Sequence, residues 1–419
     1  MTRPAAPCTA LVLSGGGARG AYEAGVLSYV RGELARELGR QPRLDVVCGT
    51  SIGAVNACFI ASTAHEPARQ GDALVEAWRS LRLEEVFHWS ALRLAALPLY
   101  VLRQLRATRL RQLSWRFSDF LWPEALSRLV TERLDWMQVH RNVLAGHLSA
   151  LTVTATDIGT GRAVVFVESG APLPAWSRDP LVEVRAGSIG PHHALASGAI
   201  PLLFRPVRIG DSWFIDGSVR QNVPLAPAIR LGADRILVVA LRQQARAERA
   251  PRADAGEPPS TAALLGRILN ALLLDHTDYD LERLHRINAL IDQGERAFGP
   301  GFASSLAAIA GGDLGAPLRR VRDLVIRPSR DIGVIAREHA AQRIRRVRRG
   351  TLASRLLRRA AADAEAAADG AADLASYLLF DREFADELVA LGWYDARQKH
   401  AELLDFFSAP AAGADARSA

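Results

Sequence analysis

The chain has 419 residues, of which 49% are hydrophobic and 23% charged, so it is long and apolar enough to bury a large core. Its net charge is +7, and nearly all of the positive charge is arginine, because Lys399 is the only lysine. The three cysteines form no CxxC pair, which excludes a disulfide framework and a zinc-binding pattern and fits a reducing compartment.

Neither a membrane span nor a signal peptide is expected. The longest apolar stretch, Val46 to Ala61, is interrupted by glycine and polar residues. The apolar run from Thr9 to Leu13 is too short for a signal peptide, and cleavage near it would destroy the glycine-rich turn that follows. We therefore expect a cytoplasmic protein.

Two strand–turn–helix units open the chain. Each has a short apolar run typical of a buried strand, then a glycine-rich turn, then a helix-like segment. The expected strands are 9–13 and 44–48, the turns 14–20 and 49–53, and the helices 21–30 and 54–62. Such units predict an α/β fold that begins with parallel strands.

The second turn, Gly49-Thr50-Ser51-Ile52-Gly53, has the G-x-S-x-G pattern of a nucleophile elbow. Glycine at both ends, Gly49 and Gly53, leaves room for a strained turn that exposes the hydroxyl of Ser51. That hydroxyl is barely ionised at neutral pH, so it needs a neighbouring base to attack an ester. The turn therefore predicts Ser51 as a nucleophile for acyl transfer.

The first turn places a row of unhindered backbone amides at a helix N-terminus, which suits an anionic oxygen. The candidate oxyanion donors are the amides of Gly15, Gly16, Gly17 and Ala18. Arg19 either contacts substrate phosphate or fixes the loop through an internal ion pair.

The same turn also fits the dinucleotide-binding pattern G-x-G-x-x-G through Gly15, Gly17 and Gly20. That pattern requires an acidic residue about 20 positions further on, at the end of a second strand. Glu37 and Asp45 are the candidates, and neither ends a second strand convincingly. A nucleotide-binding fold stays an alternative that predicts stabilisation by nucleotides.

Residues 72–148 have helical spacing and no strand signal, so we expect a helical insertion that covers the elbow. This segment is rich in arginine, and tryptophans lie between the arginines at Trp78, Trp89, Trp115, Trp122 and Trp136. A second arginine-rich segment extends from Arg319 to Arg359. Both are either solvated helix faces or surfaces for an anionic membrane, and tryptophan with arginine favours a peripheral membrane surface. No nucleic-acid motif accompanies them, so no nucleic-acid partner is expected.

After the insertion, an alternation of strands and short helices is expected. The strands are 148–156, 162–167, 204–209, 212–215 and 235–241, and the short helices are 193–198 and 224–231. The strand that ends at Ile215 is followed by Asp216-Gly217-Ser218. A carboxylate at this place, in a partly desolvated cleft, can hydrogen-bond Ser51 and act as its general base.

Histidine is the usual base for a serine, but none of the ten histidines follows a late strand as in α/β-hydrolases. His192 and His193 lie near the expected cleft, and a structural role is the better interpretation of each. Two alternatives stay open. One is a soluble esterase or thioesterase with a Ser-His-Asp triad, and the other is a non-catalytic membrane-surface binding protein.

Residues 243–260 lack periodicity and contain prolines and glycines, which predicts a linker or mobile loop. Residues 261–407 are expected to form a mainly helical C-terminal region, with an amphipathic helix at 261–291 and one late strand at 321–327. We expect the tail, 408–419, to be disordered.

The three motifs in this order resemble the patatin-like phospholipase family of lipid acyl hydrolases. The family's G-G-G-x-R/K-G loop is similar to Gly15–Gly20, and its G-x-S-x-G is similar to Gly49–Gly53. Its D-G-G/A motif is similar to Asp216-Gly217, with Ser218 in place of the usual third glycine or alanine. The segments 196–201 and 222–224 also occupy family-like places.

The resemblance covers about residues 8–242 and implies a three-layer α/β/α hydrolase with a mainly parallel central sheet, the catalytic domain. It implies a Ser-Asp dyad, with Ser51 as nucleophile and Asp216 as base, and an acyl-enzyme intermediate. It implies phospholipid or related acyl esters as substrates and no metal or cofactor. The residues expected to support the motifs are Arg19, Gly20, Gly49, Gly53 and Gly217.

Overall fold

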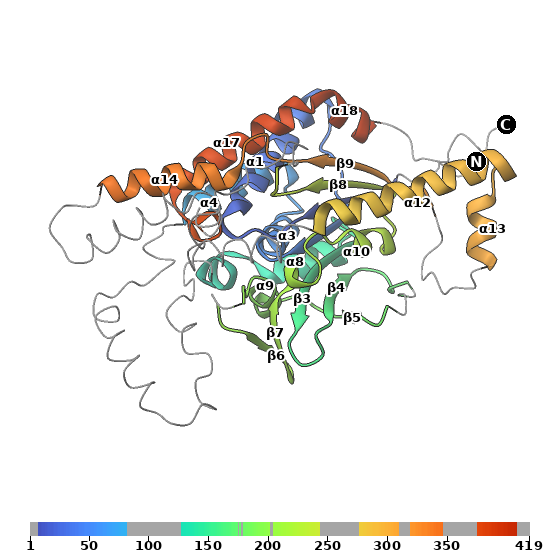
Figure 1. The fold of residues 1–419 in the computed structure, drawn as a ribbon, viewed down its shortest axis with the longest axis horizontal. Coiled ribbons are helices and arrows are strands. Elements are labelled where there is room, and N and C mark those ends of the chain that lie inside the picture. The colour runs from blue at the N-terminus through green and yellow to red at the C-terminus, as the bar shows by residue number, and fades with distance from the viewer. Residues whose placement is uncertain are drawn as a thin grey trace, which may run out of the picture.

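The computed structural model describes residues 7–81, 127–174, 176, 179–201, 204–243, 276–309, 319–346 and 375–408. Within these residues, nine strands form one sheet with helices on both faces (Figure 1). The strands are β1 (Thr9–Leu13), β2 (Val46–Thr50), β3 (Ala150–Asp157), β4 (Ala163–Ser169), β5 (Val182–Ala186), β6 (Val207–Ile209), β7 (Ser212–Asp216), β8 (Arg235–Val239) and β9 (Arg322–Ile326).

The α-helices are α1 (Ala21–Tyr29), α2 (Ala35–Glu37), α3 (Ile52–Ser62), α4 (Pro67–Arg79), α8 (Trp136–Leu144), α9 (Pro191–Ser197), α10 (Leu225–Arg230), α12 (His276–Phe298), α13 (Phe302–Ile309), α14 (Ile332–Arg346), α17 (Arg382–Gln398) and α18 (His400–Ser408). In the described part of the chain, four short 3-10 or π segments are η1 (Gly17–Gly20), η2 (Val30–Leu34), η5 (Leu129–Arg133) and η6 (Gly217–Val219).

The sheet is mixed and mostly parallel. Its strand order is β5-β4-β3-β2-β1-β8-β9, and the β6–β7 hairpin joins it through β3. Strands β3, β2, β1, β8 and β9 run parallel to one another. Strands β4 and β7 run antiparallel to β3. The expected α/β/α arrangement with a mainly parallel central sheet is confirmed.

The period-2 alternation of the strands divides the core between the two faces of the sheet. In β1, Leu11 and Leu13 pack into the larger cluster, which includes side chains of α1, α3, α4, α8 and α17. Ala10 and Val12 point the other way, into a smaller cluster with α10 and α12. Both faces of the central strands are therefore covered, as parallel strands require.

The sequence predicts most strands to within about two residues, and two departures have local causes. The hairpin strand expected from 204 begins at Val207 as β6, because Pro206 cannot donate a ladder hydrogen bond. The sequence pattern does not predict β5, whose five residues are half-buried or exposed beside β4. A short edge strand of this kind carries no buried apolar run to mark it.

Several predictions from the sequence lie outside the described residues. Of the predicted helical insertion, 72–148, the structure describes α4 and α8 near its ends and not residues 82–126, which include Trp89, Trp115 and Trp122. The same holds for 244–275, for much of the second arginine-rich segment and for the tail from 409. The domain boundary at residue 242 stays a prediction.

Residues late in the chain pack against the first helix. Helix α17 lies along α1 (Figure 1), and two glycines permit the close contact. A Cβ on Gly25 would overlap the carbonyl oxygen of Val389, and a Cβ on Gly392 would overlap that of Tyr22. The hydroxyl of Tyr22 also donates to Asp395 on α17 at 3.0 Å. Helix α1 directly follows the first glycine-rich turn, so the packing of α17 on α1 also supports that turn.

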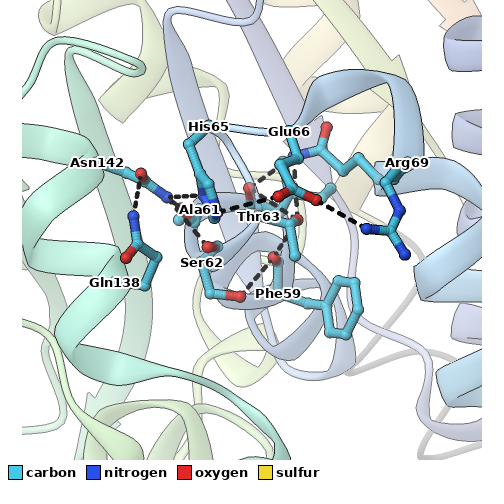
Figure 2. Close-up of polar contacts among 11 residues, drawn as sticks. Phe59, Ala61, Ser62, Thr63, His65, Glu66, Arg69, Gln138 and Asn142 are labelled. Atoms are coloured by element: carbon cyan, nitrogen blue, oxygen red, sulfur yellow. Dashed lines mark hydrogen bonds and ion pairs between the residues drawn. The ribbon is translucent and has the colours of Figure 1, made fainter.

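The helix that follows the serine turn is anchored at its far end (Figure 2). From α8, the amide of Asn142 donates to the carbonyl oxygens of Ala61 and Ser62, at 2.7 Å and 3.0 Å. Gln138 donates to Asn142 at 2.8 Å and orients it. These bonds supply side-chain donors to two carbonyls at the end of α3, and they join α3 to α8.

We predict that Gly392→Ala lowers the free energy of unfolding by about 1–3 kcal/mol, because the added methyl overlaps the main chain of α1. Thermal or denaturant unfolding measures this. Gly32→Ala is the matched control, since a Cβ there meets nothing within 4 Å. It should be neutral or stabilise by up to about 1 kcal/mol through helix propensity. Equal effects of the two variants would contradict close packing of α17 on α1.

Candidate active site

Ser51 lies in a strained turn between β2 and α3. Its φ is 57° and its ψ −128°, and it is the one non-glycine residue with positive φ in the described part of the chain. The turn is closely packed on both sides of it. A Cβ on Gly49 would overlap the main chain of Gly53, and a Cβ on Gly53 would lie 2.5 Å from the carbonyl oxygen of Leu13. This is the geometry of a nucleophile elbow.

A second serine holds the elbow in place. The amide of Ser51 donates to Oγ of Ser197 at 2.8 Å, and that hydroxyl donates to the carbonyl oxygen of Thr154 at 2.6 Å. Ser197 is fully buried at the end of α9. It therefore gives the amide of the strained residue an acceptor and ties it to β3. The sequence placed Ser197 in a family-like segment and assigned it no role.

Strand β3 brings Asp216 to Ser51. With β4 along one edge of β3, both β2 and β7 pair along the other edge. β2 ends with Thr50 opposite Thr154, and β7 ends with Asp216 opposite Ala155. Because β2 runs parallel and β7 antiparallel to β3, their carboxyl ends meet end to end. Two residues 165 positions apart are thereby placed in contact.

The two side chains share a short hydrogen bond. Oγ of Ser51 donates to Oδ2 of Asp216 at 2.5 Å, and the backbone amide of Ser218 donates to Oδ1 at 2.8 Å. The main chain of Asp216 is also held, since its amide donates to Ala199 at 2.9 Å and its carbonyl accepts from Thr156 Oγ1 at 3.0 Å. Ser51 is 2% exposed and Asp216 0%. The carboxylate is thus fixed in one orientation toward the hydroxyl.

Burial raises the pKa of the Asp216 carboxyl from 3.8 to about 6, although the hydrogen bonds from Ser51 and Ser218 lower it. Desolvation disfavours the charged form, and the hydrogen bonds offset part of that effect. The carboxylate is therefore ionised at neutral pH and is a stronger base than an ordinary aspartate.

The glycine-rich loop lies against the elbow. A Cβ on Gly15 would lie 2.8 Å from the Cβ of Ser51, so only glycine fits there. The amide of Gly15 donates to Oδ1 of buried Asn222 at 2.8 Å. The 3-10 turn η1 begins with Gly17 and Ala18. Its first hydrogen bond comes after them in the chain and runs from the Arg19 amide to the Gly16 carbonyl at 3.2 Å. Asn222 thus holds the start of the loop, a role that the sequence did not reveal.

Arg19 points into the protein and is 4% exposed. Its Nε donates to Oγ of Ser376 at 2.8 Å, and its guanidinium lies 4.6 Å from the centre of the Tyr377 ring. Gly17, at a φ of 59°, packs against the main chain of Tyr377. A segment far beyond the motifs therefore covers the glycine-rich loop, which no local sequence signal indicates.

The end of the loop is held by a buried polar network. The amide of Asn56 on α3 donates to the carbonyl oxygen of Gly20 at 3.1 Å and to Glu23 at 2.7 Å. Asn56 in turn accepts from the indole of Trp78 at 3.0 Å. A Cβ on Gly20 would lie 2.7 Å from Ile52 and 2.8 Å from Trp78. Gly217 is equally confined, against Thr154 on β3.

Among the described residues, no histidine makes a hydrogen bond to Ser51 or Asp216. His193 accepts from the amide of Gly190 at 2.9 Å, and its ring packs edge-on against Phe166. His140 pairs with Glu168 at 2.6 Å. His65 lies at the far end of α3 (Figure 2). His88 lies outside the described residues.

The described residues contain no group of three or more His, Cys, Asp or Glu side chains that could hold a metal ion. None of their helices is both long enough and apolar enough to span a bilayer. A polar cavity of about 540 Å³ lies at the amino ends of β8 and β9, away from the carboxyl ends where Ser51 and Asp216 meet.

The sequence matches the model of a known protein family. The family model described as patatin-like phospholipase matches residues 11–229, more than half of the chain. No curated protein sequence matches. Among solved structures, the crystal structure of VipD from Legionella pneumophila aligns over 92% of this chain and 67% of that chain, with 14% identity and a TM-score of 0.30. At that score the likeness carries no conclusion about the site.

We predict that Asp216→Asn raises the melting temperature at about pH 8 and has less effect near pH 4. The folded-state pKa of about 6 lies above the unfolded value of 3.8. Ionisation of Asp216 therefore removes stability as the pH rises through this interval, and the loss persists above it. Asparagine does not ionise, so the difference in melting temperature should grow between about pH 4 and pH 6 and then level off. A difference that does not change with pH would contradict the raised pKa.

Proposed function

Because the chain belongs to the patatin-like phospholipase family, it is a lipid acyl hydrolase, and we propose that Ser51 and Asp216 carry out its chemistry. The observation that supports this assignment most directly is the 2.5 Å hydrogen bond from the Ser51 hydroxyl to a fully buried carboxylate. The bond joins a nucleophile in a strained elbow to a base of raised pKa.

In the proposed acylation step, Oγ of Ser51 attacks the carbonyl carbon of an acyl ester. Its proton moves along the existing hydrogen bond to Oδ2 of Asp216. The tetrahedral intermediate then collapses, and the leaving alcohol takes the proton from Asp216. The acyl group stays on Ser51 as an ester.

In the proposed deacylation step, a water molecule takes the place of the alcohol. Asp216 accepts its proton while the hydroxide attacks the acyl carbon. Collapse of the second intermediate releases the carboxylic acid and returns the proton to Ser51. The dyad ends in its starting state, so the cycle consumes one ester and one water and requires no metal or cofactor.

The oxyanion of both intermediates is assigned to the glycine-rich loop, Gly15 to Ala18. Each well-placed amide donor typically lowers such a barrier by about 3 kcal/mol. Since the Gly15 amide already donates to Asn222, the amides of Gly16, Gly17 and Ala18 are the main proposed donors. Arg19 is proposed to fix the loop through its buried contacts to Ser376 and Tyr377 and not to touch substrate phosphate.

The proposed substrates are acyl esters of phospholipids, cleaved in the manner of a phospholipase A at a membrane surface. Incubating the enzyme with phospholipid vesicles and analysing the products by mass spectrometry tests this. Free fatty acid and lysophospholipid should appear in equal amounts. Diacylglycerol or phosphatidic acid without fatty acid would contradict acyl-ester cleavage.

We predict that a fluorophosphonate probe labels Ser51 and that Ser51→Ala abolishes the labelling, because this hydroxyl lies in the strained elbow, donates to Asp216 and is next to the proposed oxyanion loop. Gel fluorescence and peptide mass spectrometry measure the site and extent of labelling. Ser62→Ala, at the other end of α3, is the control and should label normally. Undiminished labelling of Ser51→Ala would refute the assignment.

We predict that Asp216→Asn lowers kcat by about 10²–10⁴, the usual contribution of a general base, in a protein that still folds. In the wild-type enzyme, kcat/KM should rise with pH through an apparent pKa near 6, because only the ionised carboxyl accepts the proton. Steady-state kinetics on a small soluble ester across the pH range measures both. Near-normal turnover of Asp216→Asn, together with loss of activity in a histidine variant such as His88→Ala, would favour a Ser-His-Asp triad instead.

A further inference from the structure

Three exposed side chains form a row across the strands at the middle of the β6–β7 hairpin. Asp157 pairs with Phe214, so Ile158 lies opposite Trp213, and its amide donates to the Trp213 carbonyl at 2.9 Å. On the other side of β7, Arg208 lies opposite Trp213. Residues directly opposite one another share a face of the sheet, with Cβ atoms about 5 Å apart. Ile158, Trp213 and Arg208 are therefore neighbours on one face.

The row is open to solvent. Trp213 is 52% exposed, Ile158 is 48% exposed and the side chain of Arg208 is 59% exposed. The other tryptophans in the described part of the chain, Trp78, Trp136, Trp176 and Trp393, are buried or half-buried. An exposed tryptophan beside an exposed aliphatic side chain offers apolar area of the kind that a membrane interface covers.

The charge around the row is predominantly positive. In segments 157–162 and 204–221 the exposed titratable side chains are four arginines and one aspartate, namely Arg162, Arg205, Arg208, Arg220 and Asp211. Arg220 lies beside the turn at Gly161, so the two segments bring their arginines together. Arginine binds phosphate oxygens in a bidentate manner, and tryptophan prefers the headgroup level of a bilayer.

The row is also close to the candidate active site. Trp213 and Asp216 lie on the same strand, three residues apart, which is about 10 Å along β7. The hairpin projects from the lower edge of the molecule, beyond the ends of β3 and β4 (Figure 1). A surface bound through this hairpin would lie at the same end of the sheet as Ser51.

We propose that Trp213, Ile158 and the surrounding arginines form a docking surface for an anionic lipid bilayer. This inference rests on the proposed function, since a lipid acyl hydrolase meets its substrate in a membrane. Trp213 and Ile158 enter the headgroup region, and Arg162 and Arg208 contact lipid phosphates. Docking by this face brings the elbow to the membrane and does not alter the chemistry at Ser51.

Vesicle co-sedimentation tests the surface with catalysis removed. The protein carries Ser51→Ala throughout, and the vesicles contain phosphatidylcholine with or without phosphatidylglycerol. Binding to anionic vesicles should weaken as salt rises, by screening of the arginines. Trp213→Ala should weaken it about tenfold, and Arg162→Gln and Arg208→Gln about fivefold each. The matched controls are Leu144→Ala on α8 and Arg69→Gln on α4, whose side chains are both exposed, and both variants should bind normally.

The same substitutions are then made in the active enzyme. Hydrolysis of vesicle lipid should fall with the loss of binding, while hydrolysis of a small soluble ester should stay within about twofold, because the dyad is untouched. An equal loss on both substrates, unchanged binding of Trp213→Ala, or an equal loss in the Leu144→Ala control would each overturn the docking surface. Equal binding to neutral and anionic vesicles would contradict the proposal that the partner is an anionic bilayer.

These outcomes separate the two proposals. A wild-type enzyme that binds anionic vesicles through Trp213 but releases no fatty acid would leave the docking surface standing and refute the proposed function. An enzyme that releases fatty acid equally with and without Trp213 would refute the docking surface alone.

Discussion

The meeting of two strand ends on one edge of β3 is the constraint on which the candidate site depends. β2 runs parallel to β3 and ends at Thr50, and β7 runs antiparallel to β3 and ends at Asp216. These two last residues pair with adjacent residues of β3, Thr154 and Ala155. Ser51 is the residue after Thr50, and its strained turn directs the hydroxyl toward Asp216. The ladder hydrogen bonds of the sheet hold the ends of β2 and β7, and Ser51 and Asp216 come within hydrogen-bonding distance of each other.

The burial of Asp216 has opposite effects on chemistry and on stability. Desolvation raises the pKa of the carboxyl to about 6 and so makes it a better proton acceptor. The same desolvation makes the ionised form unfavourable in the folded protein at neutral pH. The amide of Ser218 and the hydroxyl of Ser51 reduce this effect without removing it. Such opposition between stability and chemistry is common at active sites.

The glycine-rich loop is short, and each part of it is held by a different region of the chain. Asn222 holds its start, Ser376 and Tyr377 hold Arg19 in its middle, and Asn56 holds Gly20 at its end. Glycine is required at these positions because the neighbouring main chains and side chains approach too closely for a Cβ. Helix α17, packed on α1 through Gly25 and Gly392, adds to this support from outside the residues that the family model matches.

The sequence alone determined the local parts of this protein. It predicted β1 and α3, the elbow around Ser51, the glycine-rich loop and the carboxylate at the end of β7. Each of these follows from residues adjacent in the chain, namely apolar runs, glycine turns and the regular spacing of apolar residues. The tertiary structure alone decided which of these parts meet. The shared edge of β3, the hydrogen bonds from Ser197 and to Asn222, and the cover by Tyr377 all join segments far apart in sequence. Local periodicity carries no information on such contacts, since strand order and register are set by packing of the whole sheet. The short edge strand β5 was not predicted from the sequence for the same reason. Its pairing with β4, and not its composition, makes it a strand.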